Sequence, residues 1–179
     1  MNSNPPPRVK KVVVIGPECT GKTDLSQFLA SHFKTDWVPE YARSYIDNLV
    51  RPYAENDLLT IAHGQIRIED EWTRGGNNSV LICDTNLYVI KVWSLFKFGT
   101  CNEDILRQIA TRQYDLYLLT FIDVPWEDDP QREHPDKRYE LYEAYLNEMK
   151  NQPVPFIEIK GEKEQRRKTA IDAVEKILK

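Results

Sequence analysis

The stretch GPECTGKT, residues 16–23, has a glycine, four further residues, Gly-Lys and then a threonine, which is the P-loop pattern of phosphate-binding proteins. Residues 9–15 before it contain the β-branched run VVVI, which predicts a buried parallel strand. Residues 22–33 after it carry apolar or small side chains with the spacing of an amphipathic helix. The motif therefore lies between a strand and a helix, which is the context that a P-loop requires.

A loop of this kind predicts binding of a nucleoside triphosphate, here ATP, together with Mg²⁺. Gly16 and Gly21 permit backbone angles that turn successive N–H groups toward phosphate oxygens. The helix that follows adds its own unpaired N–H groups. Lys22 is expected to reach the β- and γ-phosphates, and the Thr23 hydroxyl is expected to bind Mg²⁺. The predicted nucleotide-binding residues are those of the whole loop: Gly16, Pro17, Glu18, Cys19, Thr20, Gly21, Lys22 and Thr23.

Length and composition limit the classes of protein to consider. The 179 residues predict one domain with a sizeable core, and the net charge of −4 argues against a general affinity for nucleic acid or anionic membranes. No apolar stretch is long enough to span a membrane. The basic cluster at residues 163–168 contains a glutamate, Glu164, and is interpreted as a solvated helix face. Cys19 and Cys83 are interpreted as reduced thiols, which indicates a cytoplasmic protein. Residues 1–8 are expected to be a flexible leader.

Predicted strands and helices alternate along the chain, which requires an α/β fold with a parallel sheet and helices on both faces. These elements predict a single domain over residues 9–179. The strands are expected at residues 9–15, 35–39, 80–83, 116–122 and 154–159. The helices are expected at residues 22–33, 41–49, 54–72, 86–98 and 162–178, with two more beginning after Asn102 and before Leu141.

Two carboxylates stand at the carboxyl ends of predicted strands, where open α/β sheets bind their ligands. Glu40 follows the second strand directly. Asp84 follows the apolar run VLIC of the third strand, as in a Walker B motif, which places a carboxylate beside the triphosphate-bound metal. Thr23 and Asp84 are therefore the predicted metal residues. The alternative for Asp84 is an ordinary strand end, because many buried strands end in aspartate.

The segment DVPWEDDPQREHPDK, residues 123–137, is charged, contains three prolines and follows directly from the fourth strand. A lid is expected here, over about residues 124–138. Arg132 and Arg138 are candidates for closing over the transferring phosphate, and the alternative is that both are ordinary surface arginines. His134 is interpreted as a surface residue.

Other P-loop classes find less support. The fourth strand ends in FIDVP rather than the Asn/Thr-Lys-x-Asp element with which GTPases bind guanine, and the Leu-Ser-Gly-Gly-Gln signature of ABC transporters is absent. An AAA+ motor would usually have a longer chain with a helical lid domain. A small-molecule kinase fits best, because a single domain of this length carries a carboxylate after the second strand and an arginine-bearing lid after the fourth.

Further motifs accompany the P-loop: VPEYAR (38–43), IAHGQ (61–65), LICDTN (81–86), KVW (91–93) and YDLYLLTFIDVPWEDDPQR (114–132). With GPECTGKT they resemble the ribosylnicotinamide kinase domain of NadR-type proteins, over nearly the whole chain from about Arg8. The resemblance implies a three-layer P-loop fold with strand order 2-3-1-4-5. It also implies transfer of the ATP γ-phosphate to the 5′-hydroxyl of nicotinamide riboside, giving nicotinamide mononucleotide in NAD biosynthesis or salvage. The adenylyltransferase domain of larger NadR proteins is expected to be absent, since only eight residues precede the first strand.

The resemblance also assigns roles by position. Lys22 and Thr23 match the nucleotide and metal residues, and Glu40 and Asp84 match the two carboxylates. Asp84 is expected near the metal and the nucleophile, with Glu40 and Arg43 positioning ribose and phosphates, although Glu40 as the base is nearly as well supported. The candidate catalytic residues are Lys22, Glu40, Asp84, Arg132 and Arg138, and the candidate substrate-binding residues are Glu40, Tyr41, Arg43, Asp84, Trp93 and Trp126.

One position departs from the family. Some members have a tryptophan directly before the Glu-Tyr of this motif, and here that position is Pro39, with Trp37 two residues earlier. Tyr41, Trp93 or Trp126 are the candidates to stack on a substrate ring. Two alternatives therefore stay open: a kinase of another nucleoside or small hydroxyl compound, and a nucleotide switch that acts on a protein partner. A homodimer is compatible with the sequence, which indicates no interface.

Overall fold

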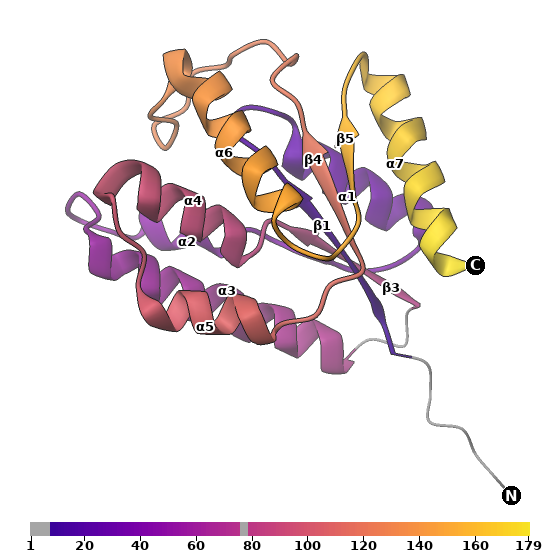
Figure 1. The fold of residues 1–179 in the computed structure, drawn as a ribbon, viewed down its shortest axis with the longest axis horizontal. Coiled ribbons are helices and arrows are strands. Elements are labelled where there is room, and N and C mark those ends of the chain that lie inside the picture. Colours follow the sequence, from indigo (N-terminus) through magenta and orange to yellow (C-terminus); the bar gives the residue numbers. More distant parts are fainter. Residues whose placement is uncertain (1–7, 76–78) are drawn as a thin grey trace, which may run out of the picture.

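The computed structural model describes residues 8–75 and 79–179. Its five parallel strands form one sheet in the order β2-β3-β1-β4-β5, which confirms the predicted fold class and strand order (Figure 1). The strands are β1 (Lys10–Ile15), β2 (Trp37–Val38), β3 (Val80–Asp84), β4 (Leu116–Thr120) and β5 (Phe156–Ile159). The helices are α1 (Lys22–Phe33), α2 (Tyr41–Asp47), α3 (Glu55–Gly75), α4 (Leu87–Phe98), α5 (Glu103–Thr111), α6 (Arg138–Lys150) and α7 (Lys163–Leu178), with a short 3-10 helix, η1 (Pro135–Lys137), before α6.

Strand β1 lies at the centre of the sheet and is buried on both faces, as a continuous apolar strand of a parallel sheet should be. Val12 and Val14 pack into one core with α1 and α7. Val13 and Ile15 point the other way, into a second core with α4 and α6. A third core joins the helices α2, α3, α4 and α5. Because successive side chains of β1 point to opposite faces, the sheet packs between two layers of helices, and the fold has three layers.

Several boundaries differ from the sequence prediction. The second strand is only Trp37–Val38 rather than residues 35–39, and the fourth ends at Thr120 rather than at residue 122. The predicted start after Asn102 is confirmed, because the Asn102 side chain accepts a hydrogen bond from the Asp104 N–H at 2.9 Å. The expected turn at residues 76–78 and residues 1–7 of the expected leader lie outside the described residues.

The topology brings the functional candidates to one edge of the sheet. The P-loop follows β1, Glu40 follows β2, Asp84 ends β3 and the lid segment follows β4. Because all strands are parallel, these four points meet at the carboxyl edge. None of the helices in residues 8–75 and 79–179 has the length and apolar character needed to cross a membrane.

Candidate active site

The P-loop is held in shape by a glycine and two buried threonines. Gly16 has a φ of 147°, and a Cβ at this position would lie only 2.4 Å from the Thr120 hydroxyl oxygen. Only glycine therefore fits between β1 and the end of β4. The buried Thr20 hydroxyl bonds to the Pro17 carbonyl at 2.8 Å and to the Thr120 hydroxyl at 2.7 Å. These contacts anchor the loop on the sheet, so that its N–H groups form a fixed cradle.

The start of α1 is suited to an anion. Its N-cap is Gly21, with a φ of 76°, and no side chain caps the first turn. The first N–H groups of the helix are therefore available to phosphate oxygens, which they attract together with the helix dipole. The Lys22 amine lies folded across the loop and donates to the Pro17 carbonyl at 2.8 Å. A bound phosphate would compete for this amine.

Thr23 and Asp84 meet at the base of the loop. The Thr23 hydroxyl donates to Asp84 Oδ2 at 2.6 Å, while Asp84 Oδ1 is buried and has no hydrogen-bond partner in the described part of the chain. Burial, and to a smaller extent the Glu40 charge, raises the pKa of Asp84 from 3.8 to about 6, against the hydrogen bond from Thr23 and the charge of Lys22. A hydroxyl and a carboxylate with a free oxygen are the ligand types that Mg²⁺ prefers. The orphaned oxygen therefore fits a magnesium site here.

Glu40 and Arg43 enter the same space from α2. Glu40 is the N-cap residue of that helix but does not cap it, and its carboxylate has no hydrogen bond or ion pair to any described residue. Arg43, one turn later, is paired with Asp129 of the lid at 3.0 Å. The contact between Arg43 and the lid argues against the surface pair with Glu40 that their spacing alone would permit.

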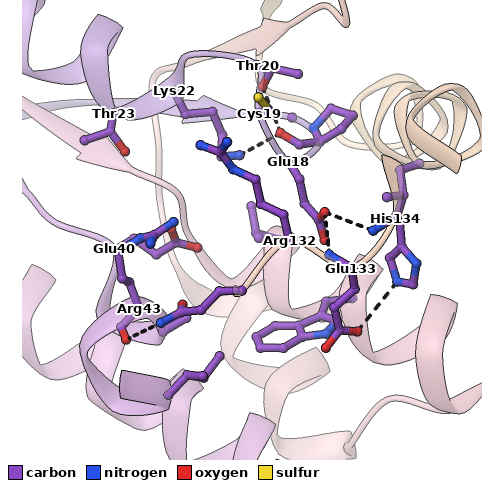
Figure 2. Close-up of a pocket in the computed structure, with 18 of the residues that line it drawn as sticks. Glu18, Cys19, Thr20, Lys22, Thr23, Glu40, Arg43, Arg132, Glu133 and His134 are labelled. Carbon is purple, nitrogen blue, oxygen red and sulfur yellow. Dashed lines mark hydrogen bonds and ion pairs between the residues drawn. The ribbon is translucent and has the colours of Figure 1, made fainter. Parts of the chain in front are cut away.

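These groups surround one pocket with a volume of about 440 Å³ (Figure 2). The P-loop and Lys22 form one end, and the lid covers the pocket from β4. The other end is more apolar and lies between α2, α4 and α6. Its lining side chains are Ala42, Ile46, Pro52, Tyr53, Val89, Trp93, Phe96, Leu141 and Tyr145. The pocket therefore joins a phosphate-binding end to an end that suits an organic ring.

The segment predicted as a lid, residues 124–138, contacts the P-loop. Glu18 Oε2 accepts the N–H groups of Glu133 at 2.9 Å and His134 at 3.2 Å. Cys19 Sγ accepts the Glu127 N–H at 3.2 Å and contacts the Pro125 carbonyl at 3.4 Å. The side chains of Glu18 and Cys19 thus both bind the backbone of this segment. From the sequence, both residues were predicted only to bind the nucleotide.

The structure separates the two lid arginines. Arg132 lines the pocket and extends from the lid toward Lys22 (Figure 2). Arg138 does not line the pocket: it is the first residue of α6, and its guanidinium donates to the carbonyls of Cys19 and Val124, each at 2.9 Å. The expectation that both arginines face the phosphates is therefore corrected for Arg138, which ties the lid to the P-loop instead.

Two predicted ring-binding residues also lie away from the pocket. The Tyr41 ring packs over Gly64 of α3, where an added Cβ would be 2.0 Å from the ring. The Trp126 indole donates to Asp128 at 2.9 Å and stacks near the lid arginines rather than in the pocket wall. Trp93 is the predicted aromatic residue that does line the pocket. The other predicted site residues lie in the wall or, for Asp84, directly behind Thr23.

Several pocket residues were not predicted as site residues, among them Tyr145, Tyr53 and His134. Tyr145 is an interior position of α6 by its helical spacing, but it also lines the pocket, where burial and the Glu40 and Glu18 charges raise the pKa of its hydroxyl. Tyr53 follows the Arg51-Pro52 break after α2, the one local signal of a loop there. His134, expected on the surface, lies half-buried against Phe96 with ring centroids 5.1 Å apart.

The interpretation of residues 163–168 as a solvated helix face is wrong for Arg166. Its side chain is buried, and it bonds to the Thr20 carbonyl and to Asp123. Burial lowers the pKa of this guanidinium although Asp123 opposes the effect. Arg166 therefore ties α7 to the back of the P-loop, a role that only the tertiary fold reveals.

A sheet of this order, with a P-loop after β1, a buried carboxylate ending the neighbouring strand β3 and an arginine-bearing segment after β4, is the fold of P-loop kinases. Comparison with known families agrees. Residues 11–166 match the AAA domain family of P-loop proteins, and the chain belongs to that family.

The similarity to NadR proteins is also confirmed. The chain is 25% identical over 130 residues to the trifunctional NAD biosynthesis/regulator protein NadR of Salmonella typhimurium (strain LT2). The matched region covers 69% of this chain. The chain spans about a third, 31%, of that relative's length. It shares the fold of a NadR protein solved in complex with NR, with a TM-score of 0.79 and 22% identity over 96% of this chain and 52% of the other. A NadR structure with NAD and AMP-PNP gives a TM-score of 0.78 and 21% identity, over 96% of this chain and 50% of the other.

Proposed function

We propose that this domain transfers the γ-phosphate of ATP to the 5′-hydroxyl of nicotinamide riboside and so forms nicotinamide mononucleotide. The observation that carries the proposal is the shared pocket, in which the P-loop, the Glu40 carboxylate and the lid arginine Arg132 adjoin an aromatic end. Among residues 8–75 and 79–179, the Glu40 carboxylate has no hydrogen-bond or ion-pair partner. The similarity to NadR, a protein solved with NR, supports this acceptor.

The donor end suits ATP. A NadR structure contains AMP-PNP, an ATP analogue, which supports the same donor here. We place the phosphates on the N–H groups of the P-loop, with Lys22 and Arg132 adding positive charge from the loop and from the lid. Thr23 and Asp84 would hold Mg²⁺, which when bound neutralises part of the triphosphate charge.

The acceptor end suits an alcohol that carries no phosphate of its own. Arg43 is paired with Asp129 at 3.0 Å, and Arg51 is paired through both terminal nitrogens with Asp57, at 2.7 and 2.9 Å. Because carboxylates already neutralise these cations, the acceptor end offers little net attraction to a second phosphate group. This favours a nucleoside over a nucleoside monophosphate as acceptor.

The reaction requires removal of one proton. As the acceptor oxygen forms its bond to the γ-phosphorus, the bond from that phosphorus to the β-phosphate oxygen breaks, ADP leaves and the hydroxyl proton must go to a base. Asp84 Oδ2 already accepts from Thr23, whereas the Glu40 carboxylate faces the pocket without a partner among the described residues. We therefore propose Asp84 as the metal residue and Glu40 as the group that orients the hydroxyl and accepts its proton.

A kinase of a different nucleoside is the second candidate. It is favoured by Pro39, which stands where some NadR domains have a tryptophan, and by Tyr41, whose ring packs over Gly64 instead of facing the pocket. Both positions alter the ring-binding end without touching the phosphate chemistry.

The unpaired thiols of all three cysteines support the further proposal that the protein works in the reducing cytoplasm.

The test is a kinase assay of the purified chain with ATP and Mg²⁺ against nicotinamide riboside, adenosine, uridine and thymidine. We expect product from nicotinamide riboside, detected by mass, and at least about 100-fold less with Lys22→Ala. Turnover of another nucleoside instead would keep the kinase and reject the acceptor. ADP formation without any phosphorylated acceptor would support the nucleotide switch.

A further inference from the structure

Glu133, in the lid, is bound from two sides of the pocket. Its N–H donates to Glu18 of the P-loop at 2.9 Å. Its carboxylate accepts two hydrogen bonds from Lys97 Nζ, at 3.0 and 2.9 Å, and one from the Tyr53 hydroxyl at 3.0 Å. Lys97 is in the last turn of α4, and Tyr53 is in the loop between α2 and α3. The residue directly before Glu133 is Arg132, the arginine that extends toward Lys22 (Figure 2).

The three side chains Tyr53, Lys97 and Glu133 form a compact group, which we term the latch. Besides its bonds to Glu133, Lys97 Nζ donates to the Tyr53 hydroxyl and lies 3.8 Å from the centroid of the Tyr53 ring. The same hydroxyl accepts a hydrogen bond from Trp93 Nε1 at 2.8 Å. The latch therefore connects the lid to the aromatic end of the pocket by charge-assisted bonds, in a half-buried setting where they are stronger than on an open surface.

We propose that Lys97 is a positioning residue of the kinase, which acts through Glu133 to hold Arg132 over the phosphate-binding end of the pocket. The inference rests on the proposed function. Two independent anchors, Glu18 on the N–H and the latch on the carboxylate, fix Glu133 and thereby the backbone from which Arg132 extends. Catalysis by a charged group depends on such pre-organisation, because a lid arginine that moves freely must be ordered at every turnover.

A second ion pair on the same helix provides the control. Lys91 of α4 is paired with Glu148 of α6 at 2.7 Å, with side-chain exposures of 23% and 17% that are comparable to the 31% and 33% of Lys97 and Glu133. Neither Lys91 nor Glu148 lines the pocket or belongs to the lid. Lys91→Met therefore removes an ion pair of similar exposure, between α4 and α6, without touching the latch.

The experiment measures kcat and KM with the acceptor that the wild type phosphorylates. We expect Lys97→Met to lower kcat about fivefold, equivalent to about 1 kcal/mol, with the KM for ATP within about twofold of wild type. Lys97→Arg should restore most of the loss, and Lys91→Met should have no effect on kcat. In an Arg132→Ala background Lys97→Met should cause no further loss, because the two residues then act on one step. Equal losses in both backgrounds, or an unchanged kcat, would overturn the proposal.

Hydrogen exchange gives a readout that needs no acceptor. The N–H groups of Glu133 and His134 should exchange faster in Lys97→Met and in Glu133→Gln than in wild type and Lys91→Met. Equal exchange in all four proteins would overturn the positioning role. If the wild type phosphorylates none of the nucleosides, the proposed function fails, while this exchange comparison still decides whether the latch orders the lid.

Discussion

Asp84→Asn should make the ligand-free protein more stable and at the same time inactive. The side chain of Asp84 is buried, its Oδ1 has no hydrogen-bond partner within residues 8–75 and 79–179, and burial raises its pKa to about 6. A carboxyl whose pKa is raised on folding binds its proton more tightly in the native state, so the protein loses stability as the pH rises through the range from 3.8 to 6. Below that range the native and unfolded carboxyls are both protonated and nothing is lost.

The expected magnitude follows from the same values. Moving a carboxyl pKa from 3.8 to about 6 costs about 3 kcal/mol at pH 7, at about 1.4 kcal/mol per pH unit, and only about 1 kcal/mol at pH 4.5. Asparagine has nearly the same shape, keeps an oxygen that can accept from Thr23, and carries no charge. The variant should therefore gain about 2–3 kcal/mol over wild type at pH 7, or about 5–10 °C in melting temperature for a chain of this length.

The assay is urea unfolding of both proteins at pH 7 and pH 4.5, with the slope on urea compared to exclude a change of the unfolded state. Asp172→Asn on the exposed face of α7 is the control and should change stability by less than about 0.5 kcal/mol at either pH. Mg²⁺ with a nonhydrolysable ATP analogue should stabilise wild type and much less the Asp84→Asn variant. A variant no more stable than wild type at pH 7, or one with the same advantage at both values of pH, would refute the reasoning.

Two further predictions concern the lid and the loop. Arg132→Ala should lower kcat at least about 100-fold, with a smaller loss of melting temperature than Arg138→Ala. Arg132 donates to one carbonyl, that of Glu127, whereas Arg138 donates to two, those of Cys19 and Val124, and these carbonyls lose their donor in the variants. Equal melting temperatures would contradict this division. Gly16→Ala should abolish nucleotide binding or lower the free energy of unfolding by more than about 2 kcal/mol, since its Cβ would lie 2.4 Å from the Thr120 hydroxyl oxygen. Gly75→Ala is the control in the same calorimetric measurement. It should be nearly neutral, because its Cβ would meet nothing within 4 Å.

The parts of the fold that the sequence predicted are those set by local patterns. The helix over residues 22–33 agrees with α1 because a glycine before it and helical spacing within it both act over a few residues. The second strand was predicted too long, because the Thr35 hydroxyl bonds to the Val80 carbonyl and takes the place of a regular ladder there. A hydrogen bond from a side chain in place of the backbone depends on the neighbouring strand β3, so the local sequence could not predict it.

The candidate site shows the same division more sharply. Thr23 and Asp84 were both predicted as metal residues, from the P-loop and from the Walker B pattern, and the structure joins them by a hydrogen bond at 2.6 Å. Arg132 and Arg138 are equivalent in the sequence, and only the path of the lid separates them. Arg166 is 146 residues from its partner Thr20, so that no local pattern distinguishes it from the exposed lysines and arginines around it.

Departures from ordinary local preference gather at the phosphate end of the pocket. Two of the three non-glycine residues with positive φ in residues 8–75 and 79–179 are Cys19 in the P-loop and Thr85 directly after Asp84, and the third is the C-cap residue Lys34. Left-handed backbone is costly for a β-branched threonine. The buried carboxylate of Asp84 adds a further cost when ionised. Since a sequence selected for stability alone would remove all three features, their coincidence at the base of the P-loop argues that this end is shaped to receive charge from a ligand.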